Sequence, residues 1–242
     1  MPSKTYGQMC PLARSLDILG ERWTLLVVRE LLLGPKRFKH LLAAFPSIGA
    51  NRLSERLRGL EQAGVVRRAT LPAPAAVPVY ELTPLGERLR DPLLRLGLWG
   101  LDLPVDERID PATARADLIA LGLTAAQPEP LDPARCETVQ FDIGDEALHL
   151  QLQDGRFLAR SGPSPSAPVL RVACDLDSFI ALALRVITPA QALGDGKLAI
   201  LAGTPMALDE VFEVLVYAPA AEPEPLTTSA SVRQPTVGSA DR

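Results

Sequence analysis

The sequence predicts two domains, an all-α N-terminal domain closed by a short β-hairpin and an α+β C-terminal domain with a five-stranded, mostly antiparallel sheet. Up to residue 103, apolar residues recur at helical spacing, whereas from residue 139 they alternate with polar residues as in half-buried strands. A charged, proline-containing segment separates the two patterns and marks a boundary. We therefore expect domains over residues 1–103 and 114–218, a linker over 104–113 and a disordered tail over 219–242.

Charge divides the chain in the same place. Residues 1–103 contain 15 Lys or Arg against 9 Asp or Glu, and the remainder contains 10 against 20, within a net charge of −4. A basic half joined to an acidic half indicates that only the first half meets a polyanion. No run reaches the roughly 20 apolar residues of a membrane span, and no apolar segment typical of a signal peptide follows the polar start, so we expect a cytoplasmic protein without membrane contact.

The elements of the first half follow from apolar spacing and from residues that end helices. Residues 23–33 are apolar nearly all round and predict a buried central helix, which Gly34-Pro35 ends. Thr83 followed by Pro84 predicts the start of a long helix that carries an apolar stripe to Trp99. Between them we expect helices at 37–45 and 50–62 and hairpin strands at 65–69 and 79–82.

The helix at 50–62 is the candidate DNA reader, because this order of elements is that of a winged helix-turn-helix. Leu53, Leu57 and Leu60 share one face, so the opposite face is left for the major groove. Arginine can bind guanine and asparagine can bind adenine through paired hydrogen bonds. Basic residues just before this helix are placed for backbone phosphates. The predicted DNA contacts are Lys36, Arg37, Lys39, Asn51, Arg52, Ser54, Glu55, Arg56 and Arg58. The alternative is an ordinary solvated helix of a helical bundle.

Residues 8–101 resemble the HxlR family of bacterial regulators in the order and spacing of their motifs. The matching motifs include Cys10-Pro11, Gly20 to Thr24, Gly34-Pro35 and Tyr80 to Thr83. The resemblance implies a winged helix-turn-helix and a homodimer formed through the terminal helices, here residues 11–19 and 84–102. One departure is that residues 69–80 contain no charge, which puts a contact between this wing and the minor groove in doubt.

The resemblance also makes Cys10 a candidate redox sensor, since some members of the family sense oxidants at such a cysteine. A reactive thiol needs a lowered pKa, which Arg14 one turn away could provide. The alternative is a small side chain that packs near the dimer helix. The three cysteines have neither the spacing of metal ligands nor an even number, so we expect no metal site and no disulfide framework.

The second half resembles the sterol carrier protein family over residues 114–216. The matching features are Asp154-Gly155, the segment from Gly194 to Leu198, and the apolar helices at 175–187 and from 204. The resemblance implies an apolar tunnel for lipids. The helix at 175–187 is apolar on several faces, whereas a single sheet packed against it can cover only one of them. The candidate pocket residues are Phe179, Ala183, Val186, Val211, Phe212 and Leu215. A filled core without a cavity is the alternative.

Together these features predict a dimeric transcription regulator whose partners are double-stranded operator DNA, a second copy of itself and a hydrophobic small molecule. We expect no catalytic residues and no cofactor, since His40 and His149 lie in unrelated elements and no phosphate loop, nucleophile elbow or dinucleotide motif occurs. The alternative function is a lipid carrier whose N-terminal domain binds another protein rather than DNA.

Overall fold

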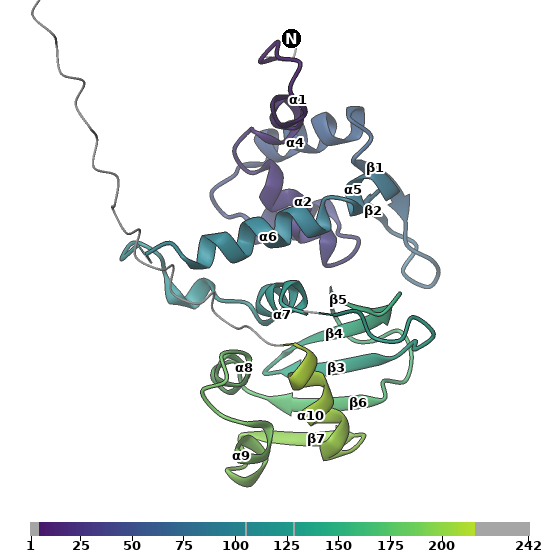
Figure 1. Cartoon of the computed structure of the whole chain (residues 1–242). Coiled ribbons are helices and arrows are strands. Elements are labelled where there is room, and N and C mark those ends of the chain that lie inside the picture. Colours follow the sequence, from purple (N-terminus) through teal and green to yellow (C-terminus); the bar gives the residue numbers. More distant parts are fainter. Residues whose placement is uncertain (1–4, 105, 128, 216–242) are drawn as a thin grey trace, which may run out of the picture.

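The computed structural model describes residues 5–104, 106–127 and 129–215, and the predicted tail at 219–242 lies outside them. The chain forms a helical N-terminal domain with a hairpin and, beneath it in Figure 1, a sheet domain flanked by helices. The elements of the first domain are α1 (Pro11–Leu19), α2 (Thr24–Leu32), α3 (Phe38–Ala44), α4 (Ala50–Gln62), β1 (Val66–Thr70), β2 (Pro78–Leu82), α5 (Pro84–Glu87) and α6 (Arg90–Leu101).

Helix α2 occupies the centre of the first domain, as its apolar sequence predicts. Val27, Val28 and Leu31 are buried, and α2 contacts α3, α4, α6 and β2. Strands β1 and β2 pair antiparallel, with Val66 opposite Leu82. The backbone of Lys36 forms an isolated bridge to Tyr80 beside this hairpin. The predicted winged helix-turn-helix is therefore confirmed as a fold.

The predicted single helix from Pro84 to residue 102 is wrong, because it is divided into α5 and α6. The Thr83 side chain caps α5 by accepting a hydrogen bond from Gly86 N. The cause of the division is Pro92, whose ring would collide with the carbonyl of Arg88 in a continuous helix and which has no N–H to donate to it. Helix α6 begins at Arg90, which places Pro92 in a first turn where no such donor is needed.

The second domain is an α+β fold with one five-stranded sheet. Its strand order is β5-β4-β3-β6-β7, in which β3 and β6 are parallel and the other pairs antiparallel. The predicted fold class is confirmed. The elements are a 3₁₀ turn (Pro111–Thr113), α7 (Ala116–Ala125), β3 (Thr138–Ile143), β4 (Glu146–Gln153), β5 (Arg156–Ser161), β6 (Leu170–Cys174), α8 (Leu176–Ala183), α9 (Pro189–Gly194), β7 (Leu198–Ala202) and α10 (Pro205–Val214).

The predicted helix at 175–187 is too long, since α8 ends at Ala183. Arg185 takes a left-handed conformation (φ 56°), and Leu184 and Val186 are exposed. Pro189 disfavours a helical conformation for the residue before it, and Thr188 instead caps α9 with a capping box. The apolar residues after Ala183 therefore belong to a connection between two helices.

Candidate nucleic-acid interface

Helix α4 has the two faces that the sequence predicts. Leu53, Leu57 and Leu60 are buried, whereas the polar side chains opposite them are exposed. A hollow of about 650 Å³ lies at the start of this helix. It is lined by Ile48, Gly49, Ala50, Asn51, Arg52, Glu55 and Arg58. The helix therefore offers two arginines, an asparagine and a carboxylate to any ligand that enters this hollow.

Two of the predicted contacts on α4 are held within the protein. Arg56 forms ion pairs with Glu21 (3.4 Å) and Glu55 (3.3 Å), and only 17% of its side chain is exposed. Ser54 is half-buried, and its carbonyl accepts a hydrogen bond from Arg58 Nε at 3.4 Å. Arg56 thus orients Glu55 from the flank of the helix, while Arg52 and Arg58 lie on its open face.

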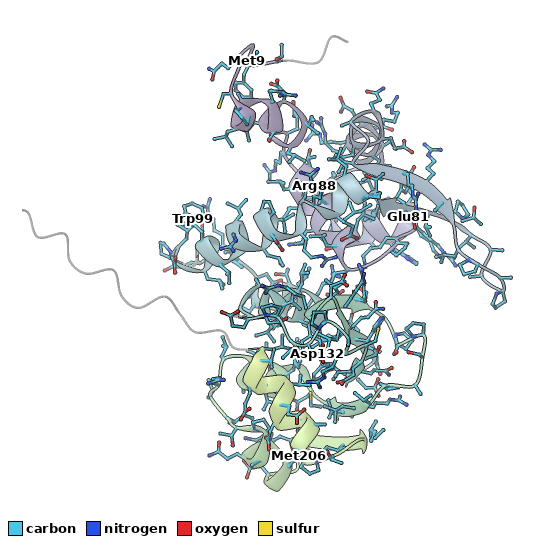
Figure 2. The ribbon with its side chains drawn as sticks, turned by 45° about the vertical axis from the view of Figure 1, so that its right-hand side comes forward. Met9, Glu81, Arg88, Trp99, Asp132 and Met206 are labelled. Atoms are coloured by element: carbon cyan, nitrogen blue, oxygen red, sulfur yellow. The ribbon has the colours of Figure 1, made fainter. Side chains whose placement is uncertain are left out.

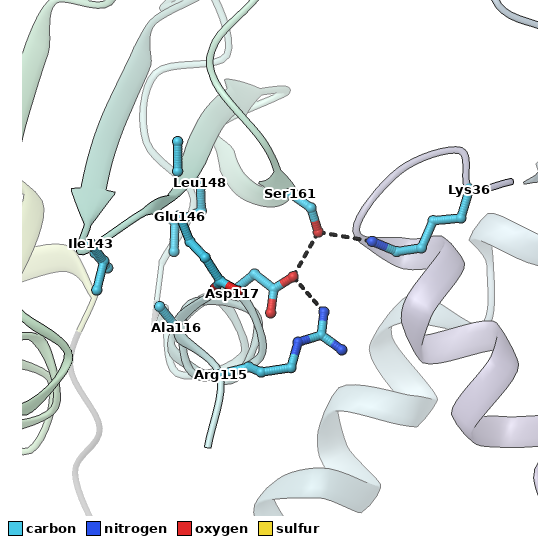
Figure 3. Close-up of a pocket in the computed structure, with 9 residues that line it drawn as sticks. Lys36, Arg115, Ala116, Asp117, Ile143, Glu146, Leu148 and Ser161 are labelled. Atoms are coloured by element: carbon cyan, nitrogen blue, oxygen red, sulfur yellow. Dashed lines mark hydrogen bonds and ion pairs between the residues drawn. The ribbon is translucent and has the colours of Figure 1, made fainter. Parts of the chain in front are cut away.

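The prediction that Lys36 faces DNA is wrong, because its side chain lies between the two domains (Figure 3). Lys36 Nζ donates a hydrogen bond to Ser161 Oγ (3.0 Å) and lies 3.9 Å from Glu30. Burial lowers the pKa of this ammonium, although Glu30 and Asp117 act to raise it. The bridge to Tyr80 holds Lys36 in an extended strand, where neighbouring side chains point to opposite sides. The side chains of Lys36 and Arg37 therefore face different surfaces of the protein.

Arg37 and Lys39 instead line a second hollow, of about 430 Å³, with the wing. Arg68 on β1 and Tyr80 on β2 belong to the same hollow, and the Arg68 guanidinium lies 5.5 Å from the Tyr80 ring centroid. Sequence reasoning did not single out Arg68 as a DNA contact, although Arg67-Arg68 is a visible basic pair in the strand that follows the reading helix. The uncharged wing tip is thus accompanied by basic residues at the base of the wing.

The titration of His40 reflects the local positive charge at α3. Slight desolvation and the nearby charges of Lys39, Arg37 and Lys36 lower the pKa of His40. Neighbouring cations that disfavour a protonated imidazole would favour a phosphate anion at the same place. The electrostatics of α3 therefore suit a polyanion.

A buried polar network joins the domains at the end of α2. Glu30 is fully buried and its Oε1 accepts hydrogen bonds from Arg29 and Arg115, each at 3.0 Å. Arg115 also donates to Asp117 Oδ2 (2.7 Å), which accepts a further bond from Ser161 Oγ (2.7 Å). Figure 3 shows the resulting chain of contacts, in which Lys36 reaches Ser161 and Arg115 reaches Asp117. The network spans a hollow of about 210 Å³.

Backbone contacts fix the same junction. Ser161 N donates to Leu33 O at 2.9 Å, and Arg160 Nη1 donates to Leu32 O at 2.8 Å. These carbonyls belong to the last residue of α2 and to its C-cap, where a helix leaves its acceptors without partners inside the helix, and Leu32 O also accepts from Arg90 at 3.2 Å. Strand β5 therefore completes the hydrogen bonding of the central helix of the other domain.

The ligand pocket predicted between residues of α8 and α10 is wrong as a cavity, because side chains fill it. Phe141 on β3 makes edge contacts with Phe179 (centroids 5.4 Å apart) and with Phe212 (6.1 Å). Val211 and Leu215 are buried beside them, and Val186 is exposed in the connection after α8. Of the six predicted lining residues, only Val211 and Ala183 border any described hollow, in two different places.

An apolar cavity of about 490 Å³ lies between α6, α7 and α8. Its walls come from both domains. Apart from Arg29, Thr113 and Arg115 the lining is apolar, with Leu93, Leu94, Gly97, Leu98, Leu101, Ala114, Leu118, Ile119, Leu121, Gly122, Leu123, Ile180, Ala183 and Leu184. The sequence alone did not indicate this cavity, because its lining residues are spread over several helices.

Apolar side chains also remain exposed on the terminal helices of the first domain. On α1 only Ala13 is buried, and Leu12 is 67% exposed. Leu96 and Trp99 on α6 are 49% and 60% exposed, and Figure 2 shows Trp99 on the part of α6 that projects from the domain. These surfaces are available to another chain.

The cysteines differ in environment. Cys10 is half-buried at the N-terminus of α1, and its role as a redox sensor stays a prediction. Burial, together with the charge of Asp175, raises the pKa of Cys174 to about 11, so this thiol is protonated at neutral pH. Cys174 is thus a poor nucleophile at neutral pH.

Both halves of the chain match known families. Residues 18–106 match the HxlR-like helix-turn-helix family, and residues 117–210 match the SCP-2 sterol transfer family. No helix among the described residues is both long and apolar enough to span a membrane.

Individual relatives are similar to less than half of this chain. An uncharacterized HTH-type transcriptional regulator of Bacillus subtilis, YvaP, is 39% identical over 107 residues, which cover 44% of this chain and 94% of the relative. The HTH-type transcriptional regulator YodB of the same organism is 38% identical over 92 residues, covering 38% of this chain and 82% of YodB. The solved structure of reduced YodB has 36% identity and a TM-score of 0.36, and the match covers 41% of this chain and all of that one.

Proposed function

This chain belongs to the HxlR-like helix-turn-helix family of transcriptional regulators, and we propose that it acts in the cytoplasm as a homodimer that reads operator DNA with α4. The observation that carries this proposal is the open polar face of α4 opposite its buried leucines. A rigid helix with one buried stripe and one polar face is what the major groove admits. The protein is proposed to act without catalysis.

We assign base contacts to the open face of α4 and phosphate contacts to the second hollow. Arg52 and Arg58 can each form paired hydrogen bonds with a guanine, and Asn51 can do so with an adenine. Arg37, Lys39 and Arg68 surround a hollow beside the wing and supply charge without reading sequence. Lys36 is omitted from this set because its ammonium is held by Ser161.

The exposed apolar surfaces of α1 and α6 support the homodimer. Side chains such as Leu12 and Trp99 would be costly to leave in water over a whole helix face. A two-fold dimer would place its reading helices about one turn of DNA apart, so the half-sites should be spaced by about 10–10.5 bp or a multiple of that distance.

We further propose that a hydrophobic small molecule modulates operator binding through the second domain. The match to a sterol transfer family and the apolar cavity at the domain junction support this. A ligand can shift operator affinity only if it binds the DNA-competent and DNA-incompetent states differently. A lipid carrier whose N-terminal domain binds a protein is the second candidate.

Fluorescence anisotropy with labelled DNA from upstream of the chain's own gene tests the function. We expect saturable binding that resists competition by unrelated DNA and weakens with salt. Binding of the upstream fragment and unrelated DNA with equal affinity would contradict the proposal. Lipid transfer between vesicles without any DNA binding would favour the lipid carrier.

A further inference from the structure

Two walls of the apolar cavity between α6, α7 and α8 carry a glycine that lines the cavity. Gly97 lies on α6 and Gly122 on α7, and both line the cavity. Apart from the glycine itself, its two chain neighbours and the backbone of its own helix, no atom of the described residues lies within 4 Å of the position that a Cβ would take at either glycine. Glycine destabilises a helix interior relative to alanine, so space for a ligand is a reason for its presence at both positions.

The polar part of the lining is cationic. Arg29 and Arg115 line the cavity and donate to the same oxygen of Glu30, so the two guanidinium groups lie together. Arg29 Nε is buried without a hydrogen-bond partner among the described residues. Among the described residues, the ion pairs of Arg29, Lys36 and Arg115 are made with two carboxylates, those of Glu30 and Asp117. Glu146 lines the same hollow as Lys36 and Arg115 but is exposed and forms no ion pair with them. One further anion would balance this charge.

We propose that this cavity binds an amphipathic organic monoanion, with its apolar body between the three helices and its carboxylate or equivalent group at Arg29 and Arg115. The volume of about 490 Å³ is about three times the roughly 150 Å³ cavity that holds one benzene in an engineered core. An elongated chain or a body of several fused rings fits that space. This site is distinct from the filled core between α8 and α10.

The position of the cavity explains how its ligand would regulate. On α6, Leu93, Gly97 and Leu101 face the cavity, and Leu96 and Trp99 lie on the opposite face at 100° per residue. A ligand therefore contacts the reverse side of the helix that we propose to form the dimer. Its anionic group also competes with Glu30 for Arg115, which joins the two domains. This regulatory part rests on the proposed function, whereas the binding site does not.

Titration of the full chain with 1-pyrenebutyrate and with its uncharged counterpart 1-pyrenebutanol, followed by pyrene fluorescence, tests the site. Hydrogen bonds to charged groups predict a preference of about ten- to hundredfold for the carboxylate. Replacing Arg29 by Gln should reduce this preference, because it lowers the affinity for the carboxylate more than the affinity for the alcohol. Gly97→Leu and Gly122→Leu should each weaken both probes at least about tenfold by filling the cavity.

Gly194→Leu is the matched control, because Gly194 lies at the end of α9, has equally open surroundings and does not line the cavity. Gly194→Leu should bind both probes with the affinity of the parent, and thermal unfolding should show that all variants fold. Unchanged binding by Gly97→Leu, or equal affinity for the two probes, would overturn the proposal. Two further outcomes would also overturn it. Probe binding that appears only after residues 216–242 are removed would assign the cavity to a segment of the same chain. Loss of the dimer in Gly122→Leu would assign the cavity to a second copy of the chain.

Operator binding measured on the same samples separates the two proposals. Specific operator binding without probe binding overturns the ligand site and leaves the proposed function standing. Probe binding that follows the expected variant pattern, in a protein that does not bind its upstream DNA, confirms the site and overturns the function. Probe binding with unmoved operator affinity overturns the regulatory part alone.

Discussion

Replacing Glu30 by Gln should weaken the junction between the two domains, because this carboxylate is the shared partner of the buried cations. Glu30 is fully buried, accepts from Arg29 and Arg115 at 3.0 Å and lies 3.9 Å from Lys36. Glutamine keeps the size and one acceptor oxygen but removes the negative charge. Three cations would then face only Asp117.

The magnitude follows from burial. Removing one partner of a buried ion pair costs about 3–5 kcal/mol. The side chains of Arg29 and Arg115 are 28% and 29% exposed and that of Lys36 is 13% exposed, so water screens part of this cost. We expect a loss of about 2–4 kcal/mol, which corresponds to a decrease in melting temperature of about 5–15 °C for a protein of this size.

Thermal unfolding followed by circular dichroism measures this loss. The control is Glu55→Gln, whose side chain is 64% exposed and pairs with Arg56 at 3.3 Å. A surface ion pair of this kind contributes about 0–1 kcal/mol, so the control should unfold close to the parent. If the free energy of unfolding of Glu30→Gln also lay within about 0.5 kcal/mol of the parent value, the network would not hold the domains together and this reasoning would be refuted.

Three further predictions concern DNA binding and assembly. Arg52→Ala and Arg58→Ala should each cost about 1–3 kcal/mol of operator affinity by anisotropy, whereas Arg171→Ala in the second domain should cost nothing; unchanged affinity in the double variant would exclude the assigned face. The parent should be a dimer by light scattering and Trp99→Glu should shift it toward monomer, so a monomeric parent would refute the dimer. Desolvation and neighbouring cations lower the pKa of His40, whereas a bound phosphate would raise it, so DNA binding should take up a proton and strengthen as pH falls from 7.5 to about 5.5; an equal pH dependence in His40→Gln would contradict this.

Local pattern was sufficient to predict most of the secondary structure. The leucines of α4 repeat at helical spacing and are buried by their own domain, and the alternation around Phe141 identifies a strand without knowledge of its neighbours. The division of α5 from α6 was also within reach, since Pro92 is visible in the sequence and its effect is local.

Features that depend on long-range contacts could not be predicted in the same way. The orientation of Lys36 depends on Tyr80 and on Ser161, which is 125 residues away. The apolar cavity depends on the packing of α6 against α7 and α8, and the filled core depends on how closely Phe179 and Phe212 approach Phe141. Spacing along one element carries no information on such distances.

The contact between Lys36 and Ser161 also has a consequence for synthesis. At about 5–20 residues per second, the ribosome adds Ser161 about 6–25 s after Lys36, since 125 residues separate them. During this interval the Lys36 ammonium and the Leu33 carbonyl lack the partners that Ser161 provides, whereas Leu32 O still has Arg90 of its own domain as a donor. The N-terminal domain can therefore fold early with its charges in water, and those charges are desolvated only when β5 docks against α2.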